Sequence, residues 1–293
     1  MSEDDWLAER FEEHRGRLRA VAYRMLGSLA EADDAVQEAW LRLSRSGTAD
    51  IENLAGWLTT VTGRVCLDML RSRRARREES LEVHVPDPIV EADVPGPEDE
   101  AMLADSVGLA LLVVLDTLAP AERLAFVLHD MFGVPFDEIA PIVGRSEPAA
   151  KMLASRARRR LQGAVPEPGT DRTRQREVVD AFLAAARDGD FEALLAVLDP
   201  DVVLRVDTGA VRPVPSVLVR GAPAVAAQAL LFSRLSRHIQ PALVNGVPGL
   251  VTAPGGQPLS VMGFTIRDGK IIEMDILADP DRLDRLDLTI LDD

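Results

Sequence analysis

The sequence predicts a multidomain protein in which two all-α helical domains are followed by a C-terminal α+β domain. Three observations support this fold class. Apolar residues recur at helical spacing through most of residues 6–163. Stretches rich in proline, glycine or acidic residues interrupt that pattern at 78–105 and 164–173. From residue 174 onward, helical segments give way to short strand-like runs. A chain of 293 residues is long enough for two or three such domains.

Composition excludes several classes of protein. The hydrophobic share of 47% is ordinary for globular proteins and sufficient for buried cores. The chain has no uncharged apolar run of about 18 residues, so no membrane span is expected. The acidic N-terminus does not resemble a secretory signal. The one cysteine, Cys66, excludes an internal disulfide and is expected to be a buried small residue in a reducing compartment. We therefore expect a cytoplasmic protein.

The first predicted helical domain, residues 1–77, contains three helices. The third, over about residues 54–74, is amphipathic, and its polar face carries Arg64, Asp68 and Arg71 at i, i+4 and i+7 spacing. The apolar stripe of this helix comprises Leu58, Val61, Val65 and Met69.

Residues 78–105 are predicted to be an acidic, proline-rich linker. The stretch contains ten acidic residues, four prolines and no lysine or arginine. It lacks helical periodicity, so an extended conformation is expected, of a kind that suits a strand crossing a basic groove.

The second helical domain, residues 106–163, contains a helix-turn-helix pattern. A short helix beginning at Phe136 is followed by a glycine turn at Gly144 and by Ser146, which is placed to cap the next helix. That helix is expected from Glu147 to about Leu161. Its predicted buried stripe is Ala150, Leu153, Ala157 and Leu161, and its predicted outward face carries Lys151, Ser155 and Arg158.

After a second linker at 164–173, residues 174–293 are predicted to be an α+β domain, with helices first and a curved antiparallel sheet after them. Asp268-Gly269 between two strand-like runs indicates a hairpin. Helices are expected at 174–187, 190–198 and near 222–236, and strands at 202–207, 214–219, 239–245, 249–253, 258–267 and 270–277.

The distribution of charge points to DNA, although the total does not. A net charge of −15 taken alone argues against a nucleic-acid binder. However, residues 64–77 contain six arginines and one acid, and residues 151–160 contain five basic residues and no acid. An acidic chain with two compact basic stretches can touch DNA at two places without coating DNA generally.

Three segments resemble the extracytoplasmic-function (ECF) sigma factors of bacterial RNA polymerase. EADDAVQEAWLRL (31–43) and GWLTTVTGRVCLDMLRSRRARRE (56–78) are similar to region 2 of that family. LAPAERLAFVLHDMFGVPFDEIAPIVGRSEPAAKMLASRARRRL (118–161) is similar to region 4. The resemblance spans both regions in the family's order. It implies a specificity subunit that directs promoter-specific initiation of transcription.

Further segments resemble the ECF41 (SigJ-like) subgroup, which has a fused SnoaL-like domain related in fold to NTF2. They are Val85-Pro86-Asp87-Pro88, Asn245-Gly246-Val247-Pro248-Gly249 and Asp279-Pro280-Asp281-Arg282-Leu283. The Asp-Gly-Gly-Gly turn of that subgroup is replaced here by Asp207-Thr208-Gly209-Ala210. The resemblance implies a C-terminal NTF2-like cone, residues 174–293, that regulates the sigma factor in cis.

The resemblance also implies roles for individual residues, with core RNA polymerase (the β′ clamp helices and the β flap) and promoter DNA as partners. The −10 element would be bound by Arg64, Arg71, Arg73, Arg74, Arg76 and Arg77. The −35 element would be bound by Lys151, Ser155, Arg156, Arg158 and Arg159. Polymerase would be bound by Asp33, Asp34, Glu38 and Trp40, and interdomain contacts would be made by Asn245, Gly246, Pro248 and Asp281.

An alternative function stays open at this point: a SnoaL-like small-molecule sensor or enzyme with a helical DNA-targeting module. Such chemistry needs a positioned acid or base, and Asp207, His238 and Asp275 are the candidates. The C-terminal domain has one histidine and no cluster with metal-ligand spacing. We therefore expect no enzyme activity, metal or other cofactor, and the sequence does not indicate whether this domain binds a ligand.

Overall fold

A computed structural model describes residues 3–46, 51, 53–76, 83–92, 108–162, 172–209, 215–231 and 233–288. The chain divides into two compact units that do not follow its linear order. The helical unit comprises Met1–Glu79 and Val114–Gln162, and the C-terminal unit comprises Ser80–Val113 and Gly163–Asp293. The described part of the predicted linker, residues 83–92, therefore belongs to the C-terminal unit, and the two predicted helical domains share one unit except for the start of the second, up to Val113.

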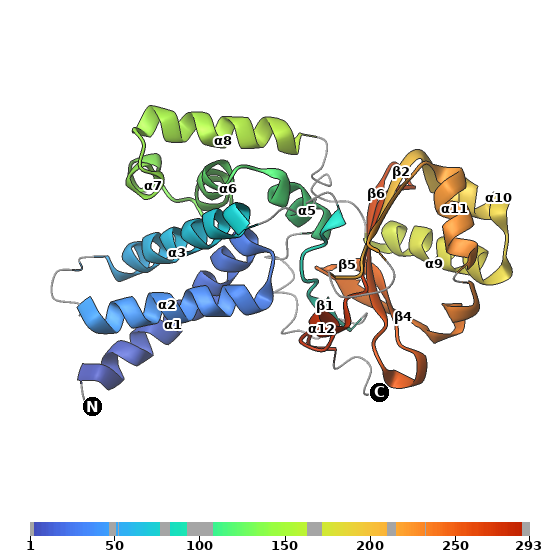
Figure 1. The fold of residues 1–293 in the computed structure, drawn as a ribbon, viewed down its shortest axis with the longest axis horizontal. Helices are drawn as coiled ribbons and strands as arrows, with labels where there is room; N and C mark the ends of the chain where they lie inside the picture. Colours follow the sequence, from blue (N-terminus) through green and yellow to red (C-terminus); the bar gives the residue numbers. More distant parts are fainter. Residues whose placement is uncertain are drawn as a thin grey trace. The chain divides into compact units, whose positions relative to one another are not determined.

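The helical unit is built from two groups of helices (Figure 1). No helix in the described part of the chain is both long and apolar enough to cross a membrane. The first group is α1 (Glu3–Leu26), α2 (Leu29–Ser46) and α3 (Leu54–Arg76), and the second is α6 (Pro120–Phe126), the π-helix η2 (Val127–Met131), α7 (Phe136–Val143) and α8 (Glu147–Leu161). The boundary between the two units falls within α5 (Leu109–Thr117).

A close approach of helices joins the two groups. Gly63 on α3 faces the second group, where an added Cβ would lie 3.3 Å from the side chain of Leu128 and 3.6 Å from that of Leu124. A small residue at position 63 therefore lets α3 pack against α6 and η2. Cys66, one turn further along α3, is buried, and burial raises the pKa of its thiol to about 12. A thiol in this state is a poor redox sensor, in agreement with the expectation of a buried small residue.

The C-terminal unit is the predicted α+β cone. Helices α9 (Arg172–Asp188), α10 (Phe191–Val197) and α11 (Ala222–Leu231) lie on one face of a curved sheet (Figure 1). Short helices η3 (Ser233–His238), η4 (Pro254–Gly256) and α12 (Pro280–Leu283) join or follow the strands. The strands are β1 (Val90–Glu91), β2 (Leu198–Asp207), β3 (Val217–Arg220), β4 (Ile239–Val244), β5 (Val247–Thr252), β6 (Ser260–Arg267) and β7 (Lys270–Leu277).

The sheet is mixed, which corrects the prediction of an antiparallel one. Across the described residues the strand order is β1-β4-β5-β6-β7-β2-β3, and β2 runs parallel to β7 while all other neighbours are antiparallel. Alternation of apolar residues predicts a strand but not its direction, so this pairing was not predictable from the pattern. The hairpin at Asp268-Gly269 is confirmed, because both residues have positive φ, as the tightest hairpin turns require.

The core of the C-terminal unit lies between the helices and one face of the sheet. Phe182 of α9 and Phe264 of β6 meet there with ring centroids 5.6 Å apart. Met274 and Ile276 of β7 point into this layer, so Asp275 between them points to the opposite face. The buried members of the layer are apolar, from Val179 on α9 to Met274 on β7. Hydrophobic side chains therefore form the core between the helices and the sheet in the described part of the chain.

Candidate nucleic-acid interface and linker-binding site

The predicted helix-turn-helix is present as α7 and α8. Gly144 after α7 has φ 67° and ψ 41°, the left-handed conformation that glycine adopts without strain. Ser146 occupies the N-cap position of α8 in an extended conformation, and its carbonyl accepts a hydrogen bond from the Ala150 N–H at 3.0 Å. Pro148 is tolerated because it lies in the first turn of α8.

The buried stripe of α8 differs by one residue from the prediction. Ala154 is completely buried, whereas Leu153 is only half-buried. The stripe is therefore Ala150, Ala154, Ala157 and Leu161. Small side chains along three of these four positions let α8 pack closely on α6 and α7.

The basic residues of α8 divide into two groups. Lys151 and Arg158 lie toward the flank and are paired with acids: Lys151 Nζ is 2.6 Å from Glu147, and Arg158 Nε is 2.7 Å from Asp130. At 100° per residue, Arg156 and Arg159 project nearly opposite the buried stripe, and both are exposed. Half-buried Ser155 lies on the same outward side. Lys151 and Arg158 are also exposed, but Arg156 and Arg159 lie farther from the buried stripe, so the outward face is centred on these two instead of on Lys151 and Arg158 as the sequence indicated.

The arginines of α3 also differ among themselves. Arg64, Arg71 and Arg74 are exposed, and the nearest atoms of Arg71 and Asp68 are 3.8 Å apart. Arg73 is largely buried: its guanidinium pairs with Glu31 of α2 and donates to the Leu26 carbonyl at 3.1 Å. It therefore fastens the end of α3 to the turn between α1 and α2. The side chain of Arg76, and Arg77 altogether, lie outside the described residues.

The four residues of α2 predicted to bind polymerase lie on more than one side of that helix. Asp33 pairs with Arg19 at 2.7 Å, and Glu38 pairs with Arg42 at 2.8 Å. Asp34 is exposed. Trp40 is half-buried, with its ring centroid 5.1 Å from that of Phe11, so part of its role is packing α2 on α1.

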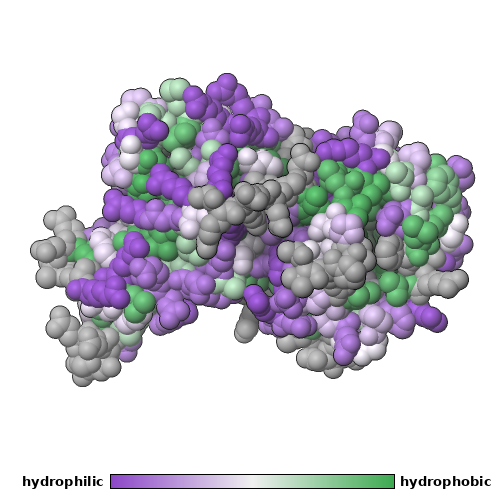
Figure 2. Space-filling view, viewed as in Figure 1, coloured by the Kyte–Doolittle hydropathy of each residue, from purple (hydrophilic) through white to green (hydrophobic). Residues whose placement is uncertain are grey.

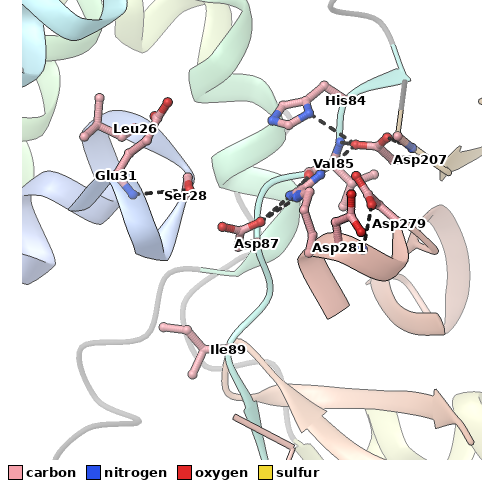
Figure 3. A network of polar contacts seen from close by, with 12 residues as sticks. Leu26, Ser28, Glu31, His84, Val85, Asp87, Ile89, Asp207, Asp279 and Asp281 are labelled. Carbon is pink, nitrogen blue, oxygen red and sulfur yellow. Dashed lines mark hydrogen bonds and ion pairs between the residues drawn. The ribbon is translucent and has the colours of Figure 1, made fainter. Parts of the chain in front are cut away.

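Within the C-terminal unit, the segment 84–91 is held by a group of buried and half-buried polar side chains that we call the linker clamp: His84, Asp87, Asp207 and Arg282. Figure 3 shows His84, Val85 and Asp87 beside Asp207 at the end of β2. Arg282 Nε donates to Asp87 Oδ1 at 2.7 Å, and Arg282 Nη1 donates to Asp207 Oδ2 at 2.9 Å. Arg282 Nη2 donates to the Val85 carbonyl at 2.6 Å. One guanidinium thus binds two carboxylates and one backbone carbonyl of the linker.

Asp207 is the centre of the linker clamp. Its Oδ2 accepts from the Val85 N–H at 3.0 Å and lies 3.2 Å from Nδ1 of His84. Burial alone would raise the pKa of Asp207, but the hydrogen bond from His84, together with the Val85 N–H and Arg282, lowers that pKa well below its usual range. Asp207, a candidate catalytic acid by sequence, is therefore held ionised as a structural anion.

The turn after Asp207 is fitted to α12. The Gly209 N–H donates to Asp207 Oδ1 at 3.1 Å, and Gly209 has φ 74°. A Cβ at Gly209 would clash with the carboxylate of Asp279, which caps α12 by accepting from the Asp281 N–H at 3.0 Å. Position 209 therefore requires glycine both for its backbone conformation and for space.

Asn245 holds the other end of the segment. Its Oδ1 accepts from the Ile89 N–H at 3.1 Å, and its own N–H donates to the Ile89 carbonyl at 2.7 Å. Just beyond, Val90 and Glu91 pair with β4 as the edge strand β1. Gly246 completes the β4–β5 turn with φ 74°, and Pro248 is buried in β5.

Of the four residues predicted to make interdomain contacts, the structure joins Asn245 to the linker. Asp281 is exposed, and its neighbour Arg282 makes the contacts with the linker instead. The sequence reasoning missed Arg282 and His84. The sequence did contain a signal for this contact. The Asp-Pro-Asp-Arg-Leu tail carries an arginine, and the Val-Pro-Asp-Pro stretch carries an aspartate with which that arginine can pair.

A second buried ionic group lies on the sheet face opposite the core. Arg205 of β2 donates to Asp275 of β7 at 3.0 Å and to Glu273 at 3.3 Å. Burial, together with the nearby charge of Glu273, raises the pKa of Asp275 to about 6 against the lowering effect of Arg205. Asp275 therefore titrates between mildly acidic and neutral pH.

This titration predicts a pH-dependent stability. Because the pKa of Asp275 in the folded chain is above its unfolded value of 3.8, its contribution to the free energy of unfolding is greatest below pH about 4. It falls as the pH rises toward about 6, by up to roughly 1.4 kcal/mol per unit, and is then constant. Asp275→Asn should lack this component, with Glu273 left to pair Arg205. Urea unfolding of both proteins at several pH values measures the difference, and parallel curves would contradict the assignment.

Comparison with known proteins agrees with this architecture. The family profile of sigma-70 region 2 matches residues 10–76, and that of sigma-70 region 4 matches residues 108–161. The chain is 36% identical to the probable ECF RNA polymerase sigma factor SigI of Mycobacterium tuberculosis, over 98% of each chain. It is 40% identical to the ECF RNA polymerase sigma factor SigJ of the same organism, over 93% of this chain and 91% of SigJ.

A solved structure extends the likeness to the fold. The crystal structure of M. tuberculosis SigJ aligns with 96% of this chain and 99% of its own length, with a TM-score of 0.77 and 35% sequence identity. The match therefore includes the C-terminal unit as well as the two sigma regions. Together with the helix-turn-helix and the basic face of α3, these similarities show that the chain belongs to the extracytoplasmic-function sigma factors of RNA polymerase.

Proposed function

We propose that this sigma factor directs promoter-specific initiation by presenting α8 to the −35 duplex and α3 to the melted −10 strand, and that the C-terminal unit regulates it in cis. The observation that best supports the proposal is the outward face of α8. This face presents Arg156 and Arg159 on the second helix of a helix-turn-helix, where such helices enter the major groove.

At the −10 element, the exposed residues Arg64, Arg71 and Arg74 are the proposed contacts on α3. Arginine binds phosphate through paired N–H donors, and each neutralised phosphate adds a salt-dependent contribution to affinity. Arg76 and Arg77 extend the same basic stretch in the sequence. Arg73 is proposed to act indirectly, because it holds α3 in place through Glu31.

Binding of core polymerase is assigned to α2. Asp33, Asp34, Glu38 and Trp40 are the proposed contacts with the β′ clamp helices, and the region around α8 is proposed to meet the β flap. Asp34 is exposed, and the ion pairs of Asp33 and Glu38 are solvent-exposed, so they exchange partners at little cost. Such a complex would act in the cytoplasm.

Regulation in cis is proposed to act through the linker. In the family, the segment between regions 2 and 4 is expected to run through the RNA-exit region of polymerase. Here residues 84–91 are bound by Arg282, Asp207 and Asn245. The same backbone groups cannot serve both sites, so polymerase must compete with the linker clamp, and the strength of the clamp would set the activity.

The alternative of a small-molecule sensor or enzyme is not favoured. In the described residues, a hydrophobic core lies between the helices and the sheet, and Asp207 and Asp275 point to the other face. Both acids are already bound by arginine, Asp207 by Arg282 and Asp275 by Arg205. A positioned general acid or base in the cone interior is what an enzyme of this kind would need.

Run-off transcription tests the proposed function. The full chain with core RNA polymerase should start RNA at discrete sites on genomic fragments. Arg156→Ala/Arg159→Ala should weaken promoter binding, and the salt slope of log affinity should be smaller by about one for each phosphate that is no longer neutralised. Arg220→Ala, which removes an exposed arginine from β3, is the control and should behave as the wild type. If no fragment yielded RNA, the proposed function would be refuted. If the double variant bound the promoter as tightly as the wild type, the role of α8 would be refuted.

A further inference from the structure

One side chain on the outward face of α8 is not basic. Met152 is 56% exposed, among the most exposed large hydrophobic residues in the described chain. At 100° per residue it lies nearly opposite the buried stripe, in line with Arg156 at i+4 and Arg159 at i+7. Figure 2 shows hydrophilic side chains over much of α8, and the exposed residues of this helix near Met152 in the sequence, Lys151, Arg156 and Arg159, are charged.

An exposed hydrophobic residue is common in proteins, and exposure by itself indicates nothing. The position of Met152 is informative because it lies in the second turn of α8, in the N-terminal half that reaches base edges in helix-turn-helix proteins. Its neighbours Arg156 and Arg159 would bring this face against phosphates. The proposed occupant of this face is therefore duplex DNA, whose charge is complementary to that of the helix.

The chemistry of the major groove then specifies what Met152 can contact. Base edges there present hydrogen-bond donors and acceptors, and the one apolar group among them is the 5-methyl of thymine. A thioether side chain makes no strong hydrogen bonds and is flexible enough to fit a methyl group. Against a donor or acceptor it would leave a polar atom without a partner, which costs free energy.

We propose that Met152 is a specificity-determining residue that reads the methyl group of a thymine in the −35 element. This proposal rests on the proposed function of α8 and adds a base preference to it. Ser155 and the arginines would supply polar and phosphate contacts, and Met152 would favour thymine over cytosine or a purine at one base pair.

Deoxyuridine isolates this contact, because it pairs like thymidine and lacks only the methyl group. Holoenzyme formed from the full chain and core polymerase would be titrated with synthetic promoter duplexes in which each thymine of the −35 element is replaced singly. For wild-type protein, replacement at one position should weaken binding about three- to tenfold, the effect expected for one buried methyl group. Met152→Ala should weaken binding to the unmodified duplex by a similar factor and show no further loss with uracil there. Met152→Leu should keep most of the discrimination.

Two controls separate the possible failures. Leu231→Ala removes a side chain that is 75% exposed in the C-terminal unit and should leave the thymine-to-uracil ratio unchanged. Arg159→Ala should weaken binding to all duplexes equally. The proposal for Met152 would be refuted if the −35 element contained no thymine. It would also be refuted if Met152→Ala showed the same thymine-to-uracil affinity ratio as the wild type at every position. If Arg159→Ala also had no effect, the role of α8 itself would be refuted.

Discussion

Replacing Arg282 with alanine is expected to release residues 84–91 from the C-terminal unit. The side chains it pairs with, Asp87 and Asp207, are 11% and 8% exposed, so water replaces little of the lost interaction. Removing one partner of a buried ion pair costs about 3–5 kcal/mol, because the remaining charge stays buried without its counter-charge. Here two carboxylates are affected at once, which makes Arg282 the most consequential residue of the linker clamp.

Hydrogen exchange measures this release directly. The N–H groups of Val85 and Ile89 donate to side chains of the C-terminal unit and should be protected in the wild type. A loss of about 3 kcal/mol in Arg282→Ala corresponds to a decrease in protection of roughly a hundredfold. Arg282→Lys should recover little, because an ammonium cannot present the planar set of donors that bridges Asp87, Asp207 and the Val85 carbonyl. Asp281→Ala, at the exposed neighbouring position, should exchange as the wild type does.

The same variant tests regulation in cis. If polymerase competes with the linker clamp for the linker, Arg282→Ala should raise promoter-specific transcription at limiting polymerase, whereas Asp281→Ala should not. Lost protection at Val85 and Ile89 without a rise in transcription would show that the clamp is structural only. Full protection in Arg282→Ala would contradict the energetic assignment.

Replacing Arg123 with methionine is expected to destabilise the helical unit by about 3–5 kcal/mol. Arg123 of α6 is 2% exposed; it pairs with the buried Asp116 of α5 and its Nε donates to the Arg24 carbonyl at 3.0 Å. It therefore joins the end of α1 to the start of the helix-turn-helix group. Methionine preserves much of the length of the side chain but leaves the Asp116 carboxylate buried without its cation. A loss of this size is a large fraction of the stability of a typical domain.

Tryptophan fluorescence isolates this effect, because all three tryptophans, Trp6, Trp40 and Trp57, belong to the helical unit. Urea unfolding should show a lower midpoint for Arg123→Met. Arg123→Met/Asp116→Asn should be less destabilised than the single variant, because removing both charges removes the uncompensated one. Arg42→Ala breaks an exposed pair with Glu38 and should cost less than about 1 kcal/mol. Equal midpoints for the wild type and Arg123→Met would contradict the role of this pair.

The sequence predicted the local structure well where a signal repeats over neighbouring residues. The helix at 54–74, the turn at Gly144 and the hairpin at Asp268-Gly269 are all present. The helix starting at Glu147 also begins where its capping signals indicated. These features depend on residues fewer than about ten positions apart, so periodicity and backbone preference determine them.

The packing and pairing of individual side chains was less predictable. Arg73 and Arg158 belong to basic runs that suggest DNA contacts, but Glu31 and Asp130 bind them in the structure. Leu153 fits the periodicity of a buried stripe, yet Ala154 takes the central position. In each case the difference comes from a neighbouring helix, whose position the spacing within one helix does not encode.

By itself, the sequence determined the family, the helices and strands, and the two basic stretches, because each is written in contiguous residues. Only the tertiary structure decided that the acidic linker belongs to the C-terminal unit and that β2 runs parallel to β7. The linker is bound through Asp87 and Arg282, which are 195 residues apart in the chain. Such a pair forms because folding buries both charges in one place, and no local pattern of residues specifies that meeting.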